Sequence, residues 1–252
     1  MAQKIGFITG GSRGLGKNTA LAMAAQGIDV ILTYHSQKDA AEAVVAEIVA
    51  MGRKAVALQL DVANASNFTG FSAQLNEVLQ SHWQRTHFDY LINNAGTGIY
   101  ASFEDTTEAM FDQMVNIHLK SVFFLTQKLV PLINDGGRIV NISSGLARFA
   151  MPGYMAYAAM KGGIEVLTRF MAKELGSRKI AVNTVAPGAI ETDFGGGVVR
   201  DNSVVNAYIA SQTALGRVGV ADDIGPMIAS LLSENNRWVN AQRIEVSGGM
   251  LI

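Results

Sequence analysis

The sequence contains no cysteine, so disulfide bonds and thiol catalysis are both excluded. Proline is scarce, with 4 residues, and charged residues make up only 16% of the chain. The net charge is −1 and both signs are scattered, so no stretch is typical of a nucleic-acid-binding surface or a membrane-surface helix. We therefore expect neither a nucleic acid nor a membrane as a partner.

Long apolar runs are also missing. No segment approaches the roughly 18 uninterrupted apolar residues that a membrane span needs. Met1 leads straight into a strand-like segment, Ile5 to Thr9, without the charged start, apolar stretch and cleavage site of a signal peptide. These absences predict a cytoplasmic protein.

Neither a metal site nor a hydrolase nucleophile elbow is expected from the sequence. The histidines, His35, His82, His87 and His118, are widely separated and show no metal-ligand spacing, so we expect no metal. His118 lies in an apolar, helix-like segment, where a packed side chain is expected. A Gly-x-Ser-x-Gly pattern occurs at residues 10–14, within the glycine-rich loop, and we do not expect it to be a hydrolase nucleophile elbow.

A regular alternation of strand-like and helix-like segments is present instead. Apolar residues make up 49% of the 252, enough for a large core. Short runs rich in Val and Ile are typical of buried parallel strands, and they cover Lys4–Thr9, Val30–Tyr34, Ala55–Leu60, Tyr90–Asn93, Arg138–Ile142, Ala181–Ala186 and Arg243–Val246. Helical spacing covers Gly14–Ala25, Ala40–Ala50, Asn67–Leu79, Thr107–Ile133, Tyr154–Leu175 and Asp222–Leu232. This order predicts an α/β fold: a single Rossmann domain over residues 1–252, with a doubly wound seven-stranded parallel sheet and helices on both faces.

Residues 188–215 interrupt the alternation. They contain Gly195-Gly196-Gly197 and only a weak helical pattern. A loop of this length inside a compact domain is usually functional or mobile. We predict a lid over the substrate here, with a plain surface excursion as the alternative.

The first strand leads into a glycine-rich loop, and a helix follows. Glycines let the backbone approach a pyrophosphate, and a helix start offers free N–H groups with a favourable dipole. A dinucleotide site requires this placement between the first strand and the first helix. The loop residues predicted to contact a dinucleotide are Gly10, Ser12, Arg13, Gly14, Leu15 and Gly16.

The spacing Thr-Gly-x-x-x-Gly-x-Gly over residues 9–16 resembles that of the short-chain dehydrogenase/reductase family, and the resemblance spans essentially the whole chain. Asn93-Asn94-Ala95-Gly96 is similar to the family's motif after the fourth strand. Asp61-Val62 lies where members of the family contact adenine, and Pro187-Gly188 with Thr192 resembles the family's nicotinamide-side segment. The resemblance therefore implies cofactor contacts from Asp61, Val62, Asn93, Ala95, Gly96, Tyr157, Lys161, Pro187, Gly188, Ile190 and Thr192.

The end of the second strand favours NADP(H) over NAD(H). NAD sites usually place an acidic residue there, whereas this strand ends in Tyr34-His35-Ser36. Arg13, where NADP-preferring members of the family often carry a base, can face a 2′-phosphate, together with His35, Ser36 or Lys38. Each of these side chains can also be an ordinary solvated group, and NAD(H) stays open as the alternative cofactor.

Tyr157 and Lys161 are four residues apart in a helix-like segment, which places both side chains on one face. A phenol pKa near ~10 is too high for a base at neutral pH, and a neighbouring ammonium lowers it. The pair therefore suits proton transfer, although this spacing also arises often by chance.

Ser143 and Ser144 end the fifth strand, at the edge where α/β folds bind ligands. The family resemblance implies that Ser144, thirteen residues before Tyr157, orients the substrate, with Ser143 as the alternative. A serine hydroxyl there can stabilise negative charge on the substrate oxygen. The resemblance also implies that Asn116 holds a water in a relay to Lys161, although an amide inside a helix can equally be a core residue.

Together these residues predict an NADP(H)-dependent oxidoreductase that interconverts a carbonyl and a secondary alcohol, with Tyr157 transferring the proton. The alternative is a non-catalytic NADP(H)-binding sensor or scaffold on the same fold. Within the family the chain resembles 3-oxoacyl-(acyl carrier protein) reductases and small-ketone reductases most. Residues 132–138, before the fifth strand, include one base and one acid, which disfavours an acyl carrier protein as the substrate carrier.

A small-molecule carbonyl or alcohol is therefore the expected substrate, in an apolar pocket lined by Leu146, Ala147, Phe149, Met151 and Tyr154. Members of the family are commonly tetramers, and the apolar segments 115–125 and 164–171 can supply such a surface, so we expect a homo-oligomer. The apolar end, residues 246–252, is expected to be buried against a partner or within its own subunit.

Overall fold

A seven-stranded parallel sheet forms the centre of the molecule in the computed structural model, which describes residues 3–252. Met1 and Ala2, the first residues of the domain expected from the sequence, lie outside the described residues. The strand order is β3-β2-β1-β4-β5-β6-β7. The strands are β1 (Ile5–Ile8), β2 (Asp29–Tyr34), β3 (Ala55–Gln59), β4 (Phe88–Asn93), β5 (Ile133–Ile142), β6 (Ala181–Pro187) and β7 (Arg243–Val246). The predicted doubly wound sheet is confirmed.

The strand order reverses between β1 and β4, which pair in parallel through Gly6 with Tyr90 and Ile8 with Ile92. Strands β2 and β3 extend the sheet on one side of this pair, and β5 to β7 extend it on the other. The loops that leave β1 and β4 therefore diverge at the carboxyl edge and open a crevice, which is where open α/β sheets bind their ligands.

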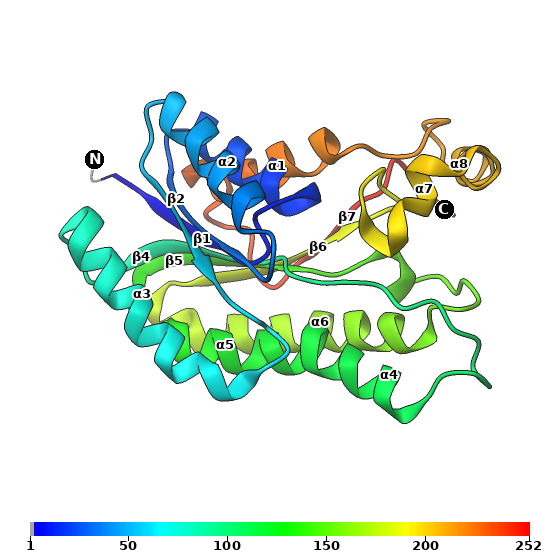
Figure 1. Cartoon of the computed structure of the whole chain (residues 1–252), viewed down its shortest axis with the longest axis horizontal. Coiled ribbons are helices and arrows are strands. Elements are labelled where there is room, and N and C mark those ends of the chain that lie inside the picture. The colour runs from blue at the N-terminus through cyan, green and yellow to red at the C-terminus, as the bar shows by residue number, and fades with distance from the viewer. Residues whose placement is uncertain (1–2) are drawn as a thin grey trace.

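Helices cover both faces of the sheet (Figure 1). One core packs α1 (Gly14–Ala25), α2 (Lys38–Ala50) and α9 (Gly225–Leu231) against the sheet, and the other packs α3 (Phe68–Trp83), α5 (Ser121–Leu129) and α6 (Met155–Glu174). Alternate residues of β1 supply the two cores, because Ile8 faces the first and Phe7 the second. Burial on both faces explains why the strands read as continuous apolar runs.

The long helix expected over residues 107–133 is helical but not uniform. It consists of α4 (Glu108–Met114), a π-helical segment (Val115–Lys120), α5 and a final 3₁₀ turn. Strand β5 then begins at Ile133 and not at the predicted Arg138. A register shift against β4 lies between the two positions, and Gly136 with its φ of 76° allows the backbone to make it.

Residues 188–215 hold more regular structure than the sequence indicates. They contain α7 (Val198–Asp201) and α8 (Ser203–Ser211), and the side chain of Asn202 caps α8 by accepting from the N–H groups of Val204 and Val205. Both helices lie at the carboxyl edge of the sheet, close to the C-terminus (Figure 1). The expectation of a mostly irregular loop is therefore wrong for this half of the segment.

The apolar C-terminal tail packs against its own subunit, with Met250 buried and residues 246–249 and 251 half-buried. Met250 packs with Ile209 of α8, and the Leu251 N–H donates to the carbonyl of Gln212. Only Ile252 is highly exposed. Within residues 3–252, no helix combines the length and apolar character that crossing a membrane requires.

Candidate active site

The glycine loop connects β1 to α1 at the carboxyl edge. Gly10 and Gly14 have φ values of 68° and 54°, which favour glycine. A Cβ on Gly16 would lie 2.0 Å from the carbonyl oxygen of Gly10, so only glycine fits the start of the helix there. The N-cap residue of α1, Arg13, makes no side-chain cap, which leaves the N–H groups of the first turn available to an anion.

Thr9 and Asn94 tie this loop to the end of β4. The Thr9 hydroxyl accepts from the N–H groups of Asn94 at 3.0 Å and Ala95 at 2.9 Å. The Asn94 side-chain amide donates to the carbonyls of Thr9 at 2.9 Å and Gly10 at 3.2 Å. Neither Thr9 nor Asn94 was among the predicted site residues, although both stand inside the motifs that were. These bonds fix the width of the crevice between the two loops.

Asn93 directs its side chain into the core. Its side-chain amide is buried and donates to Thr126 and Asn141, and Asn141 donates in turn to Thr168. This hydrogen-bonded chain runs through the core that α5 and α6 cover. The Asn93 side chain therefore holds the sheet to these helices and does not face the crevice, whereas Ala95 and Gly96 follow at its edge.

The remaining segments with predicted cofactor contacts also reach this edge. Pro187 and Gly188 end β6, where the Gly188 N–H donates to the carbonyl of Val246, and Ile190 pairs with Gly219. Thr192 lies opposite the glycine loop, 3.7 Å from where a Cβ on Gly14 would be. Asp61 and Val62 follow β3 directly and are half-buried.

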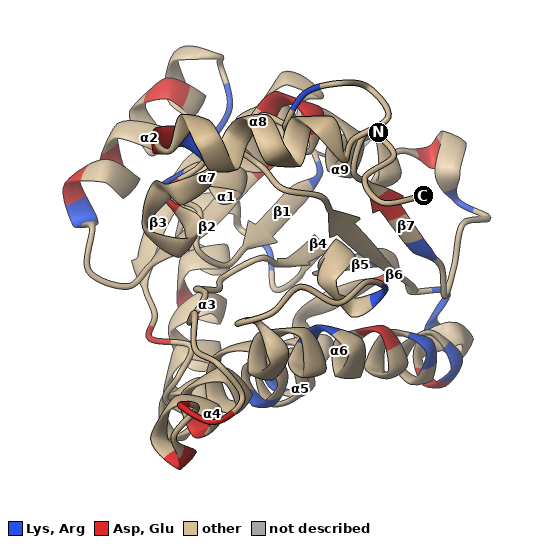
Figure 2. Cartoon of the chain, turned by 90° about the vertical axis from the view of Figure 1, so that its right-hand side faces the viewer, with Lys and Arg blue, Asp and Glu red and all other residues tan. Residues whose placement is uncertain are grey.

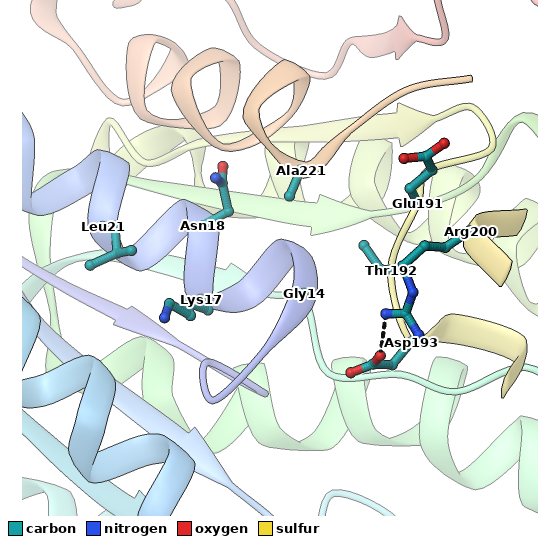
Figure 3. A pocket seen from close by; sticks show the side chains of 9 residues that line it. All are labelled: Gly14, Lys17, Asn18, Leu21, Glu191, Thr192, Asp193, Arg200 and Ala221. Carbon is teal, nitrogen blue, oxygen red and sulfur yellow. Dashed lines mark hydrogen bonds and ion pairs between the residues drawn. The ribbon is translucent and has the colours of Figure 1, made fainter. Parts of the chain in front are cut away.

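Arg13 is exposed and forms an ion pair with Asp193, with 3.6 Å between Nη1 and Oδ2. Arg200 binds the same carboxylate at 2.6 Å and lowers the pKa of Asp193. A cavity of about 310 Å³ separates the start of α1 from this cluster, and Figure 3 shows Arg200 and Asp193 facing Gly14 across it. The Asp193 carboxylate thus bridges the side chains of Arg13 and Arg200.

His35 and Ser36 lie exposed beyond the end of β2, where His35 borders a second cavity with Asp61.

Tyr157 and Lys161 lie on one face of α6 and are 7% and 5% exposed. The Lys161 Nζ is 5.4 Å from the centre of the Tyr157 ring and donates to the carbonyl of Ile142 at 2.7 Å. That carbonyl belongs to the last residue of β5, so the strand end fixes the lysine. The predicted shared face is confirmed.

Of the two serines after β5, only Ser144 is turned toward Tyr157. Its hydroxyl acts on the phenol by lowering the pKa of Tyr157, and it accepts from the Leu146 N–H at 3.2 Å. Ser143 is buried and donates to Glu165 at 2.8 Å and to the carbonyl of Lys161 at 3.2 Å. The Ser143 hydroxyl therefore points into the protein interior and does not face Tyr157.

Asn116 lies in the π-helical segment and is half-buried. Its carbonyl accepts from the Ser121 N–H, five residues on, as in a π-turn. Such turns are rare and often occur at functional sites, because they change which backbone groups are paired. This segment packs against α6, the helix that bears Tyr157 and Lys161.

Burial dominates the electrostatics of the pair. It raises the pKa of Tyr157, and the hydrogen bond with Ser144 only partly opposes this. Burial also lowers the pKa of Lys161 to about 7. The expected lowering of the Tyr157 pKa by Lys161 is thus not found, because burial raises this pKa. Tyr157 keeps its proton at neutral pH and is a hydrogen-bond donor.

Two aromatic pairs lie in this region, one that includes Tyr157 and one that joins Tyr100 to Tyr154. The ring centre of Phe194 is 5.5 Å from that of Tyr157, and Phe194 packs on Gly98, where a Cβ would come within 2.9 Å of the ring. Tyr100 and Tyr154 form an edge-to-face pair with ring centres 5.3 Å apart. The sequence analysis missed Phe194 and Tyr100, because no motif marks them.

Leu146 and Tyr154 of the predicted substrate pocket lie near this group, Leu146 packing directly with Tyr157. Phe149 and Met151 pack instead with Ile209 and Met250, between α8 and the C-terminal tail. The aromatic group is therefore bordered by the tail and by residues 188–215.

Comparison with known proteins identifies the family. The enoyl-(acyl carrier protein) reductase family model matches residues 10–251, nearly the whole chain. The chain is a short-chain dehydrogenase/reductase.

Individual relatives agree with this assignment. A hydroxynaphthalene reductase-like protein of Metarhizium majus is 34% identical over 99% of this chain and 95% of its own length. The structure of LugOII, described as a promiscuous reductase of lugdunomycin biosynthesis, has a TM-score of 0.93 and 36% identity, covering 99% of this chain and 98% of that one. The angucycline C-6 ketoreductase LanV, solved with bound NADP, has a TM-score of 0.93 and 32% identity, covering 98% and 95%.

This short-chain dehydrogenase/reductase is accordingly an enzyme that acts on C=O and CH–OH groups, as its relatives are named reductases and oxidoreductases. Nothing in the comparisons supports the alternative of a non-catalytic sensor. The substrate and the nucleotide of this chain are separate questions.

The lowered pKa of Lys161 predicts a pH-dependent effect on stability. Below about pH 7 the Lys161 side chain is charged in the folded protein, and a buried ammonium destabilises the fold. The penalty disappears as pH rises through the unfolded pKa near ~10.4, where the folded and unfolded chains are both neutral. Lys161→Met should therefore raise Tm most at pH 6 and little at pH 10, by roughly 2–4 °C for each kcal/mol of penalty removed.

Thermal unfolding of the nucleotide-free protein at both pH values measures this, with the exposed Lys173→Met as the matched control on the same helix. A Lys161→Met effect that is equal at pH 6 and pH 10 contradicts the assignment.

Proposed function

We propose that this enzyme reduces a ketone with NADPH, using Tyr157 as the proton donor. One observation carries the proposal: Tyr157 and Lys161, both buried, and the half-buried Ser144 meet at the carboxyl edge beside the glycine loop. The raised pKa of Tyr157 favours the protonated phenol, which is the form that donates a proton during reduction.

The residues present fit a dinucleotide. The glycine loop leaves no room for a Cβ at Gly16, and the uncapped start of α1 faces the crevice with free N–H groups. The chain's contacts would come from residues 10–16, 61–62, 95–96 and 187–192. Tyr157 and Lys161 would contact it on the nicotinamide side, and Arg13 would bind a 2′-phosphate. When bound, NADPH supplies the hydride.

Ser144 and Tyr157 would bind the substrate carbonyl oxygen. Two hydroxyl donors at this oxygen stabilise the negative charge that develops as the carbonyl is reduced, and Tyr157 then releases its proton to the oxygen. Lys161 would restore that proton, because its pKa of about 7 lets it give and take protons at neutral pH. Asn116 would hold a water in the relay to Lys161.

Residues 188–215 would act as a lid. Phe194 sits directly over Tyr157, and three consecutive left-handed glycines, Gly195 to Gly197, follow it. Glycines in this conformation accept backbone rearrangement more easily than other residues do. The pairing of Asp193 with Arg13 would connect the position of the lid to the nucleotide loop.

The substrate class best supported is a ketone on or next to a fused aromatic ring. Phe194 packs near Tyr157, and Tyr100 and Tyr154 form a second aromatic pair; flat side chains of this kind pack well on aromatic rings. Several relatives are named for such compounds: hydroxynaphthalene reductase-like proteins, and an angucycline ketoreductase solved with rabelomycin. A 3-oxoacyl thioester is the second candidate, because the sequence resembles 3-oxoacyl-(acyl carrier protein) reductases.

The test is a screen of NADPH oxidation with fused-ring aromatic ketones, 3-oxoacyl thioesters, small aliphatic ketones and sugars. Turnover is expected to be highest with the fused-ring ketones. Tyr157→Phe keeps the ring but removes the proton, so it should lower kcat by several orders of magnitude while NADPH still binds. Near-normal turnover by this variant would contradict the mechanism, and preference for thioesters would contradict the substrate class.

Arg13 is expected to set the nucleotide preference. Arg13→Ala should lower kcat/KM for NADPH about 10- to 100-fold, the value of a charged hydrogen bond to phosphate, and leave NADH within about twofold. Asp193→Asn, which removes the competing carboxylate but keeps Arg13, is the control and should retain the NADPH preference. Steady-state kinetics with both nucleotides measure this, and equal losses with both would refute a role for Arg13 in recognising the 2′-phosphate.

A homotetramer is the assembly we propose. Phe123 and Phe124 of α5 and Val166 and Phe170 of α6 are exposed apolar side chains on the two predicted segments. Exposed aromatic clusters of this kind usually mark an interface.

Light scattering should give four chain masses for the wild type. Phe170→Asp should shift the protein to smaller species, because it buries a charge in the interface, whereas Val49→Asp on α2, equally exposed but outside these segments, should not. A monomeric wild type would exclude the tetramer.

A further inference from the structure

His118 lies in the π-helical segment next to Tyr157 and is 1% exposed. Its Nε2 is 2.6 Å from the carbonyl oxygen of Thr97. A carbonyl can only accept, so Nε2 carries the proton and donates it to this bond. Thr97 directly follows Gly96, in the segment at which β4 meets the crevice. The imidazole thus holds the nucleotide side of the site through the backbone.

The same ring packs against Tyr157. The two rings are perpendicular, with an interplanar angle of 89° and centres 5.0 Å apart, which is a favourable edge-to-face geometry. A Cβ on Gly96 would lie 2.7 Å from Cε1 of His118, so glycine at position 96 allows the imidazole to approach this closely. One side chain therefore touches both the backbone after β4 and the phenol.

The histidine is neutral in this position. Burial, and then the charge of Lys161, lower the pKa of His118 to about 3. Its Nδ1 is buried and accepts no hydrogen bond from residues 3–252. His118 therefore neither supplies nor removes the reaction proton at working pH, and its function has to be geometric.

We propose that His118 is a positioning residue for the reduction: it fixes the Tyr157 phenol relative to the backbone that carries the nucleotide, by packing on the phenol ring while bonding Thr97. The proposal rests on the proposed function, because it assumes that Tyr157 donates the proton. Reacting groups displaced by about 1 Å from their productive positions can lose about 100-fold in rate. A rigid connection between the phenol and the nucleotide segment supplies this alignment.

The test compares His118→Phe with His118→Gln. Phenylalanine keeps a ring against Tyr157 but cannot bond Thr97, and it should lower kcat about 10- to 100-fold with the Kd for NADPH within about threefold. The solvent deuterium isotope effect on kcat should rise, because transfer of the Tyr157 proton becomes slower. Glutamine can donate to the Thr97 carbonyl but lacks the ring, so its kcat should lie between those of His118→Phe and the wild type, with an isotope effect closer to the wild-type value.

The matched control is Ser121→Ala, which alters a buried polar side chain of the neighbouring turn that bonds only the Ile117 carbonyl. It should leave kcat unchanged. If His118→Phe lowers kcat but leaves the isotope effect unchanged, the role of His118 is merely structural and the proposal is overturned. A His118→Phe variant with the same kcat as the wild type overturns it as well. If the wild-type enzyme reduces none of the ketones, the proposed function itself is overturned. If the wild type is active and His118→Phe has the same kcat, only the role of His118 is overturned.

Discussion

Desolvation of Tyr157 and Lys161 is the constraint on which the site depends. Both side chains are buried where β5 ends, and the lysine finds its hydrogen bond on the carbonyl of Ile142. Burial moves the two pKa values in opposite senses, up for the phenol and down for the ammonium. The result is a phenol that keeps its proton beside an amine that titrates near neutrality. Such a pair suits the proposed proton transfer, in which the phenol donates a proton and the amine returns one to it.

The sheet places this pair next to the nucleotide loop. Because the strand order reverses between β1 and β4, their loops separate at the carboxyl edge, and the bonds of Thr9 with Asn94 set how far. Strand β5 lies next to β4, so its end, with Ser144, meets the same crevice. Around the strand ends the ribbon is mostly free of charged residues in Figure 2, which views this side of the molecule.

The π-helical segment connects two features that look unrelated in the sequence. It contains Asn116 and His118, two residues apart, and packs on α6. The extra residue in the turn changes the pairing of the backbone near Asn116 and aims His118 at Tyr157. An uninterrupted α-helix over the same residues would rotate these side chains to other positions. The departure from regular helix is therefore part of how the site is built.

The sequence alone determined the fold and most of the site, because both depend on local patterns. Apolar runs of strand length, separated by helical periodicity, specify a parallel sheet. The glycine spacing over residues 9–16 and the separation of Tyr157 from Lys161 are readable one residue at a time. Long-range packing decided the rest. Asn93 turned into the core because Asn141 and Thr126 are its partners there, and Ser143 was taken by Glu165.

Phe194 and Tyr100 joined the site from loops that carry no motif, and His118 became a neighbour of Tyr157 only through the π-turn. The sign of the Tyr157 pKa shift was decided in the same way. Helical spacing alone brings an ammonium near the phenol, but only the packed structure shows how completely water is removed from both, and desolvation is the larger effect here.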